Sequence, residues 1–285
     1  MARILVSSRH GASSHLVKRI MNLKASIRRK FLLFIYRTLM RCGYEIRKTD
    51  TNDLPDLKQL LSQGIRPTIF DVGCNQGGVA EKYLAAWPEA HLHGFEPLPD
   101  VAQLAVKRFA GKAAVQIHNL ALCDRTGSIA FNRMAASDSS SLLQSNRSDL
   151  PASYKDVLAT TAVLEVPCDT LDRFCDERGI TSIDLLKLDV QGAELSVLRG
   201  AAGLLERRAI KVIFSEVYFL PFYESQPLFE DIAEFLQTFG YRFVLPYNLV
   251  FGSTTGRVQW ADAVFVADRK STRLNSSHEW ISRMP

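Results

Sequence analysis

Long apolar runs are missing from this sequence of 285 residues. A membrane-spanning helix needs roughly 18 consecutive apolar residues, and the longest run, residues 31–40, is interrupted by Arg37. Cysteines are also few: the five are scattered and never form a C-x-x-C pair, which disfavours a zinc or redox site and is typical of a reducing compartment. We therefore expect a cytoplasmic protein without a transmembrane helix.

Acidic residues are almost absent from positions 1–48, which contain twelve Lys or Arg residues and one acidic residue, Glu45. Residues 49–268 have the opposite balance, with 28 acidic and 19 basic residues, so the net charge of +5 hides an acidic body. An acidic body argues against a broad nucleic-acid-binding face. We expect no nucleic acid among the partners of this chain, and the sequence leaves the oligomeric state open.

The basic arm over residues 1–48 carries a helical pattern. Between residues 16 and 41, apolar side chains recur at three- and four-residue steps, with Lys and Arg between them. The pattern predicts a basic amphipathic helix, which could contact an anionic membrane surface or an acidic partner. It could equally pack on the domain with its basic face in solvent, and a mitochondrial presequence is a third interpretation.

Hydrophobic residues make up 47% of the chain, enough for one large domain, which we place at residues 49–268. Short apolar β-like runs alternate there with helical stretches, which predicts a parallel sheet covered by helices. The expected strands are 68–72, 90–95, 115–121, 183–188, 211–216, 241–245 and 263–266. The expected helices are 78–86, 100–109, 171–178, 194–205 and 228–239.

Two stretches do not follow this alternation. Residues 128–161 are irregular and Ser-rich, and we interpret them as a lid or acceptor-binding loop, the alternative being a disordered surface insertion. Residues 269–285 are polar, have no apolar period and resemble translated sequencing-adapter sequence, so we expect this tail to be non-native.

The turn Asp71-Val-Gly-Cys-Asn-Gln-Gly-Gly78 follows an apolar strand and precedes a helix. Its glycines let the backbone approach a ligand closely, and the helix start offers unpaired N–H groups. A pyrophosphate favours G-x-G-x-x-G, whereas Asn75 replaces the second glycine and Asp71 would repel a phosphate. A carboxylate can instead pair with the ammonium of S-adenosyl-L-methionine. We predict cofactor contacts from Asp71, Gly73, Cys74, Asn75 and Gly77.

Two further polar residues end the next expected strands. Glu96 follows Gly77 by nineteen residues, close to the separation at which an acidic residue accepts hydrogen bonds from ribose hydroxyls. Asn119 ends the third strand, where a polar side chain can contact an adenine rim. The alternative is that Asp71 caps the turn and Glu96 is a solvated strand end. We predict that both Glu96 and Asn119 bind the cofactor.

The second dense motif is Leu185-Leu-Lys-Leu-Asp-Val-Gln-Gly-Ala-Glu194, an apolar strand that ends in the carboxylate of Asp189. In an open α/β sheet, ligands bind outside the carboxyl ends of the strands. Four acidic residues should gather at that edge, namely Asp71, Glu96, Asp189 and Glu216. We predict a site there, with Asp189 in contact with both cofactor and acceptor.

Together these segments resemble the FkbM family of methyltransferases over residues 65–267. The resemblance rests on Phe-Asp71-Val-Gly-Cys-Asn, Gly-Phe-Glu96-Pro, Cys168-Asp-Thr-Leu-Asp172, Leu-Lys-Leu-Asp189-Val-Gln-Gly-Ala-Glu194 and Ser-Glu216-Val. It implies the Rossmann-like class I methyltransferase fold, a seven-stranded sheet with helices on both faces and its last strand antiparallel. It also implies O-methylation of a hydroxyl on a sugar, polyketide or similar small metabolite.

Methyl transfer to a hydroxyl requires alignment of the reactants and a base that takes the hydroxyl proton. Asp189 is the first candidate for that catalytic base and Glu216 the second, while Tyr218 or His118 could orient the acceptor. Two adjacent carboxylates could also hold a divalent ion, but the sequence contains no complete ligand set, and we assign no metal site.

Three other interpretations remain. A nicotinamide-dependent oxidoreductase is disfavoured by Asn75 and by the lack of a recognisable catalytic Tyr-Lys or His arrangement. A non-catalytic scaffold that binds S-adenosyl-L-methionine would keep the fold without turnover. Methylation of nucleic acid is weakened by the acidic body and by the lack of an Asn/Asp-Pro-Pro-aromatic motif, for which Leu220-Pro-Phe-Tyr is no substitute.

Overall fold

The computed structural model describes residues 54–61, 66–146, 154, 156–251 and 256–268, all of them in the unit Asn52–Pro285. The predicted amphipathic helix over residues 16–41, with its proposed membrane contact, lies outside these residues, and so does the tail 269–285. In the part of the chain that is described, no helix combines the length and the apolar character needed to cross a membrane.

Seven strands form the central sheet, in the order β3-β2-β1-β7-β8-β10-β9. Neighbours from β3 to β8 pair in parallel, whereas β10 is antiparallel to both β8 and β9. The expected seven-stranded sheet with an antiparallel last strand is therefore confirmed. The strands are β1 (Thr68–Val72), β2 (His91–Phe95), β3 (Val115–His118), β7 (Ile183–Leu188), β8 (Ile210–Tyr218), β9 (Tyr241–Phe251) and β10 (Val258–Ala267).

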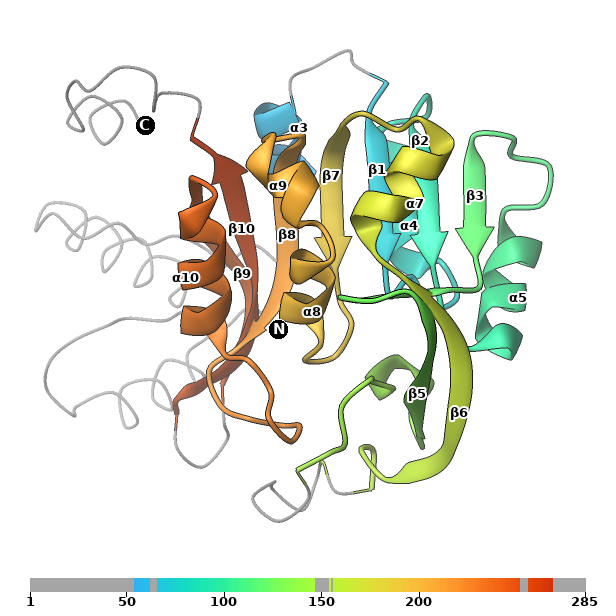
Figure 1. The fold of residues 1–285 in the computed structure, drawn as a ribbon, viewed down its shortest axis with the longest axis vertical. Helices are drawn as coiled ribbons and strands as arrows, with labels where there is room; N and C mark the ends of the chain where they lie inside the picture. Colours follow the sequence, from blue (N-terminus) through green and yellow to red (C-terminus); the bar gives the residue numbers. More distant parts are fainter. Residues whose placement is uncertain (1–53, 62–65, 147–153, 155, 252–255, 269–285) are drawn as a thin grey trace, which may run out of the picture. The chain divides into compact units, whose positions relative to one another are not determined.

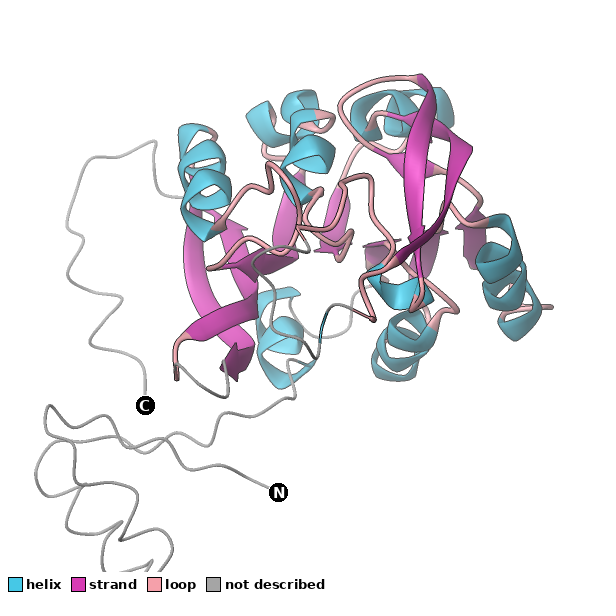
Figure 2. Ribbon diagram, turned by 90° about the horizontal axis from the view of Figure 1, so that it is seen from below, coloured by secondary structure: helices cyan, strands magenta, loops and turns pink. Residues whose placement is uncertain are grey.

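Helices cover both faces of this sheet (Figure 2), as expected. On one face, apolar side chains of α3 and α4 pack against β1, β2, β7 and β8. On the other, side chains of α7 to α10 pack against the same central strands. All six residues of β7 are consequently buried. The helices are α3 (Leu54–Leu61), α4 (Gly78–Ala86), α5 (Pro99–Arg108), α7 (Leu171–Arg178), α8 (Glu194–Arg199), α9 (Ala202–Glu206) and α10 (Phe229–Thr238).

One expected helix is divided in two. The prediction of a continuous helix over residues 194–205 is wrong, because the chain breaks at Gly200 between α8 and α9. A Cβ atom at Gly200 would lie 2.0 Å from the carbonyl oxygen of Cys123, so two backbones meet there. A residue with a side chain could not occupy this position without displacing one of them.

A second sheet of three strands, in the order β4-β6-β5, lies beyond the carboxyl ends of the parallel strands (Figure 1). It consists of β4 (Ala121–Leu122), β5 (Gly127–Met134) and β6 (Thr160–Asp169). The prediction of an irregular segment over residues 128–161 is therefore wrong for β5 and for the start of β6. Their buried apolar residues pack against Leu98 and Val101, but the start of β5 and most of β6 are exposed or half-buried, so their apolar signal is weak.

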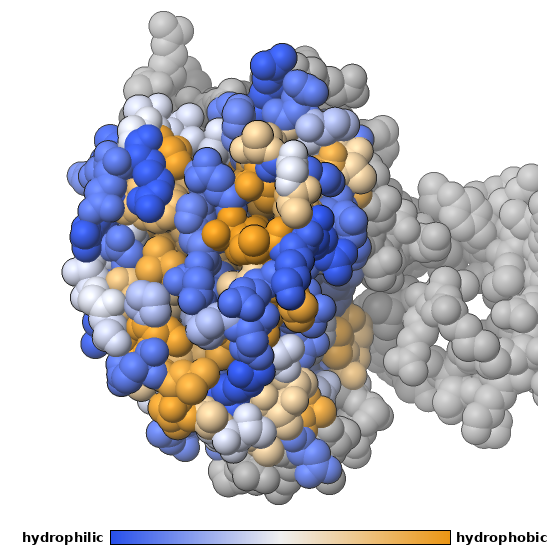
Figure 3. Space-filling view, turned by 90° about the vertical axis from the view of Figure 1, so that its right-hand side faces the viewer, coloured by the Kyte–Doolittle hydropathy of each residue, from blue (hydrophilic) through white to orange (hydrophobic). Residues whose placement is uncertain are grey.

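The α5 side of the molecule has a mixed surface. Leu104 and Val106 of α5 are exposed apolar residues. Figure 3, viewed from that side, shows hydrophobic patches divided by hydrophilic side chains. Single exposed apolar side chains of this kind are normal on soluble domains.

Candidate active site

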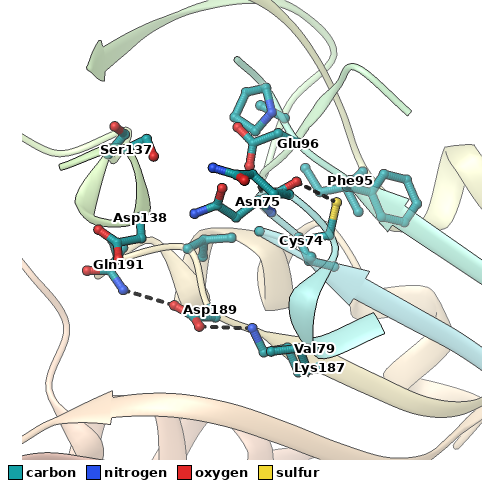
Figure 4. A pocket seen from close by; sticks show the side chains of 18 of the residues that line it. Cys74, Asn75, Val79, Phe95, Glu96, Ser137, Asp138, Lys187, Asp189 and Gln191 are labelled. Atoms are coloured by element: carbon teal, nitrogen blue, oxygen red, sulfur yellow. Dashed lines mark hydrogen bonds and ion pairs between the residues drawn. The ribbon is translucent and has the colours of Figure 1, made fainter. Parts of the chain in front are cut away.

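A cavity of about 490 Å³ opens at the carboxyl ends of the parallel strands (Figure 4). Its walls come from the turn after β1, the end of β2, the end of β7 and the segment around η1 (Ser137–Ser139). This is the edge at which the strand order reverses between β1 and β7, and open α/β sheets bind their ligands there.

The turn after β1 needs its glycines. Gly73 and Gly77 have φ angles of 79° and 82°, in the left-handed region that favours glycine. A Cβ at Gly73 would lie 1.8 Å from the carbonyl oxygen of Asp189, so this glycine lets the turns after β1 and β7 touch. At Gly78 a Cβ would meet no atom within 4 Å, because that position opens into the cavity.

Glu96 is held in place by backbone donors. Its Oε2 accepts a hydrogen bond of 3.1 Å from the N–H of Asn75, and its Oε1 accepts one of 2.9 Å from the N–H of Leu98. Burial raises the pKa of Glu96 to about 7, although these two N–H groups favour the carboxylate. The carboxyl group therefore lines the cavity in a fixed orientation, bound to the same turn as the glycines.

Lys187 sits between two carboxylates. Its Nζ lies 3.7 Å from Oδ1 of Asp71 and 2.9 Å from Oδ2 of Asp189. Burial alone would lower the pKa of Lys187, but the two aspartates hold it above its ordinary value, so the amine is charged. The register of the sheet produces this contact, because Asp71 and Lys187 are directly paired across β1 and β7.

The two aspartates differ in exposure. Asp71 is fully buried, and burial raises its pKa in spite of the neighbouring Lys187. The side chain of Asp189 is 36% exposed and lines the cavity. Desolvation opposes its ionisation, yet contact with Lys187 keeps the pKa of Asp189 below its usual range. Of the pair, Asp189 is the ionised carboxylate that a ligand in the cavity can reach.

Gln191 and Glu216 complete the group beside Asp189. The Nε2 of Gln191 donates hydrogen bonds of 2.9 Å to Asp189 and to Glu216, and Figure 4 shows Asp189 between Lys187 and Gln191. Glu216 is 7% exposed, and burial together with the charge of Asp189 raises its pKa well above the ordinary value. Glu216 lies behind Gln191 and is not among the residues that line the cavity.

The structure brings five of the predicted residues to the cavity wall: Gly73, Cys74, Asn75, Glu96 and Asp189. Asp71 lies beneath the wall, and Gly77 is the N-cap of α4. Asn119 does not line the cavity, because its amide donates to the carbonyl oxygens of Glu96 and Pro97, at 2.9 and 2.8 Å. It braces the turn that carries Glu96, and Leu120, Ala121 and Leu122 line the cavity instead.

The two residues that could orient an acceptor lie elsewhere. Tyr218 donates a hydrogen bond of 2.7 Å to Glu216, behind the cavity wall. His118 packs edge-to-face on Phe174 of α7, and its Nε2 lies 3.1 Å from Nδ1 of His93. Burial lowers the pKa of His118 to about 4, so the ring is neutral. Neither residue lines the cavity.

Sequence reasoning missed two residues of the site, Lys187 and Gln191. Both belong to the motif Leu185–Glu194, but the partner of Lys187 is Asp71 on β1 and one partner of Gln191 is Glu216 on β8. Which residues of these strands lie side by side follows from the strand register, which the sequence does not show. In the described part of the chain, no group of three or more His, Cys, Asp or Glu side chains is placed to hold a metal ion.

Comparison with known proteins agrees with this geometry. The sequence profile of the methyltransferase FkbM domain matches residues 71–243, from the glycine-rich turn into β9. The chain belongs to the FkbM methyltransferase family. Among curated proteins, the 2-O-methyltransferase NoeI of Sinorhizobium fredii is 30% identical over 216 residues, which cover 73% of this chain and 87% of NoeI. A nicotinamide-dependent oxidoreductase is not favoured by these matches.

Solved structures of methyltransferases are similar at a distance. The methyltransferase FkbM from Methylobacillus flagellatus is 12% identical, with a TM-score of 0.45, over 70% of this chain and 43% of that one. The magnesium protoporphyrin IX methyltransferase ChlM from Synechocystis, solved with bound SAM, is 11% identical, with a TM-score of 0.41, over 90% of this chain and 92% of ChlM.

Proposed function

We propose that this FkbM family member transfers a methyl group from S-adenosyl-L-methionine to a hydroxyl of a sugar or a related small metabolite. The observation that carries the proposal is the cavity wall, where the glycine-rich turn, Glu96 and Asp189 meet. Such a site contains a place for a polar cofactor and an ionised carboxylate beside it. The name of NoeI, a 2-O-methyltransferase, supports a hydroxyl acceptor.

The residues at the turn fit the cofactor. The Oδ1 of Asn75 is buried without a hydrogen-bond partner in a residue that lines the cavity, and a buried acceptor of this kind suits an ammonium donor. Each carboxyl oxygen of Glu96 accepts one hydrogen bond from a backbone N–H, so each can accept another from a ribose hydroxyl. We assign the aminoacyl tail to Asn75 and the turn that Asp71 supports from beneath, and the ribose to Glu96, while the open backbone at Gly78 leaves room beside them.

Asp189 is the base in this proposal. When bound, S-adenosyl-L-methionine supplies an electrophilic methyl group on a sulfonium. A carboxylate is too weak a base to remove a hydroxyl proton in advance, so Asp189 accepts the proton as the new bond between oxygen and methyl forms. Lys187 keeps Asp189 ionised for that task and holds it in place at 2.9 Å. Glu216 is a poorer choice of base, because a raised pKa favours its protonated form, which cannot accept a proton. It also lies behind Gln191, away from the cavity.

The acceptor is tested by a transfer screen. Purified protein with methyl-labelled S-adenosyl-L-methionine is incubated with glycans, monosaccharides and hydroxylated small metabolites, and the product is analysed for its methylated position. We expect a methyl ether on a hydroxyl. Transfer of the labelled methyl group only to an amine or to nucleic acid would overturn the choice of a hydroxyl acceptor. Binding of S-adenosyl-L-methionine without transfer to any tested acceptor would favour a non-catalytic scaffold.

A further inference from the structure

Gln191 is the most connected side chain at the cavity. Its Nε2 donates to Asp189 and Glu216, and its Oε1 lies 3.2 and 2.9 Å from the hydroxyls of Tyr218 and Tyr223. Only this orientation of the amide works, since the reverse would place its oxygen against two carboxyl oxygens. The Gln191 amide thus connects Asp189, at the end of β7, to the buried hydroxyls of Tyr218 and Tyr223.

The backbone of Gln191 is also unusual. Its φ angle of 55° lies in the left-handed region, which residues with a side chain seldom occupy. A backbone outlier of this kind is maintained by its surroundings, and such outliers cluster at functional sites. Here the surroundings include Ser141, whose hydroxyl donates a hydrogen bond of 2.7 Å to the carbonyl oxygen of Gln191.

The bond from Ser141 comes from a segment, residues 137–146, that crosses the cavity on the way from β5 toward β6. The hydroxyl of Tyr223 lies between two acceptors, Oε1 of Gln191 and the carbonyl oxygen of Ser139 at 3.0 Å. Two backbone hydrogen bonds fix the far end of the segment: the N–H of Asn146 donates to the carbonyl oxygen of Phe222 at 2.9 Å, and that of Glu224 donates to Gln144 at 2.8 Å. The segment is thus attached to Gln191 both directly and through Tyr223.

We propose that Gln191 is a positioning residue that couples segment 137–146 to the carboxylate of Asp189. With the segment seated, Ser141 and Tyr223 hold the backbone and the amide oxygen of Gln191, and its Nε2 is aimed at Asp189. When the segment lifts, this support is lost and Lys187 alone holds the carboxylate. The base of the proposed function is therefore held by both Lys187 and Gln191 only when the cavity is covered, and the inference rests on Asp189 having that role.

Asp189 also faces charged groups on every neighbouring element. Lys187 stabilises its ionised form from β7, and a hydrogen bond with Glu216 on β8 also lowers its pKa. The carboxyl groups of Asp71 on β1 and Glu194 on α8 oppose ionisation, and Asp138 of η1 lines the same cavity. The hydrogen bond from Gln191 adds to the effect of Lys187. Removing that bond should therefore raise the titration midpoint of Asp189, because a donor to a carboxylate favours its charged form.

The test is a carbon-13 NMR titration of the Asp189 side-chain carboxyl in the full-length protein, assigned with Asp189→Asn. Gln191→Met keeps the length of the side chain and removes all of its hydrogen bonds, and we expect it to raise the midpoint by about half a pH unit. Tyr223→Phe removes only the hydroxyl that links Gln191 to Ser139, and we expect a smaller rise of the same sign.

Tyr154→Phe is the matched control, because its hydroxyl bonds to Gln259 at 3.4 Å, away from Gln191. It should leave the midpoint unchanged, and the other aspartates in each spectrum report on general structural damage. An Asp189 midpoint that stays at the wild-type value in both Gln191→Met and Tyr223→Phe would overturn the coupling. The titration needs neither cofactor nor acceptor, so calorimetry with S-adenosyl-L-methionine on the same samples separates a failed proposed function from a failed coupling.

Discussion

At the scale of single residues, the site depends on carboxyl groups whose surroundings differ. Glu96 is nearly buried and has a pKa of about 7, whereas Asp189 stays ionised beside Lys187. In the proposed function, Glu96 accepts hydrogen bonds from the cofactor's hydroxyls and Asp189 acts as the base, so the two groups have separate tasks. Each task predicts a different result on substitution.

The first residue-scale prediction concerns Glu96 and pH. Its pKa is raised from 4.5 to about 7 on folding, so its contribution to stability is present below pH 4.5 and is lost as pH rises through 7. Glu96→Gln stays neutral and should escape that loss. Between pH 5 and pH 8, urea unfolding should therefore shift in favour of the variant by roughly 2–3 kcal/mol. An unchanged difference between the two proteins at both pH values would contradict the environment assigned to Glu96.

The second concerns Asp189. Asp189→Asn keeps the shape of the side chain and its neighbours but cannot accept the hydroxyl proton. We expect S-adenosyl-L-methionine affinity within a factor of about three and a transfer rate lower by roughly 10²–10⁴-fold. Calorimetry and labelled methyl transfer measure the two quantities, with the exposed Asp176→Asn as a control that should retain both. Full turnover in Asp189→Asn would show that another group takes the proton.

At the scale of elements, the ends of β1 and β7 are in contact through Gly73. Gly73→Ala would place a Cβ 1.8 Å from the Asp189 carbonyl oxygen at a φ of 79°, so the two turns must separate. We expect a loss of about 2–4 kcal/mol in the free energy of unfolding, measured by chemical denaturation. Gly78→Ala is the control, since its Cβ meets nothing within 4 Å and stability should change by less than about 1 kcal/mol. Equal losses in both would show that the turns do not touch.

The motif ending in Asp172 has a structural role at this scale. The Asp172 carboxylate accepts hydrogen bonds from the N–H groups of Gly203 and Leu204, at 2.7 and 2.8 Å, and so caps α9 from α7. Asp172→Ala should lower the free energy of unfolding by about 1–2 kcal/mol, because it leaves both donors unpaired. Glu177→Ala, which removes an exposed ion pair with Arg173, should cost less than about 0.5 kcal/mol. Thermal melts that do not distinguish the two variants would rule out this cap.

How far the elements could be predicted depends on how they bury their side chains. The strands Thr68–Val72 and Ile183–Leu188 have the predicted bounds, since a strand buried on both faces is mostly apolar, here with Asp71, Asp184 and Lys187 as charged exceptions. Strand β5 was missed because Ser, Asn and Arg interrupt its apolar residues and because Asn132 is buried although it is polar. The break at Gly200 was missed because it depends on the backbone of Cys123, a contact that is distant in sequence.

At the scale of the whole molecule, the order of elements was predictable and the contacts between them were not. Alternating strands and helices, with carboxylates at the strand ends, indicated one sheet edge and the site there. The sequence could not show that Glu216 bonds to Gln191 behind the cavity wall. Nor could it show that the Asn119 amide bonds to the backbone of Glu96 and not to a ligand. The cofactor half of the cavity is built from local motifs, whereas the acceptor half uses the segment between β5 and β6, which is irregular in sequence.

The central claim is that the cavity at the carboxyl ends of the strands binds S-adenosyl-L-methionine through Glu96 and the glycine-rich turn that Asp71 supports. Isothermal titration calorimetry of S-adenosyl-L-methionine and of NAD, on the wild type, Asp71→Ala and Glu96→Ala, tests it most directly. We predict saturable binding of S-adenosyl-L-methionine, no binding of NAD, and at least about tenfold weaker binding in each variant. Wild-type affinity for S-adenosyl-L-methionine in both variants, or binding of NAD in its place, would contradict the claim.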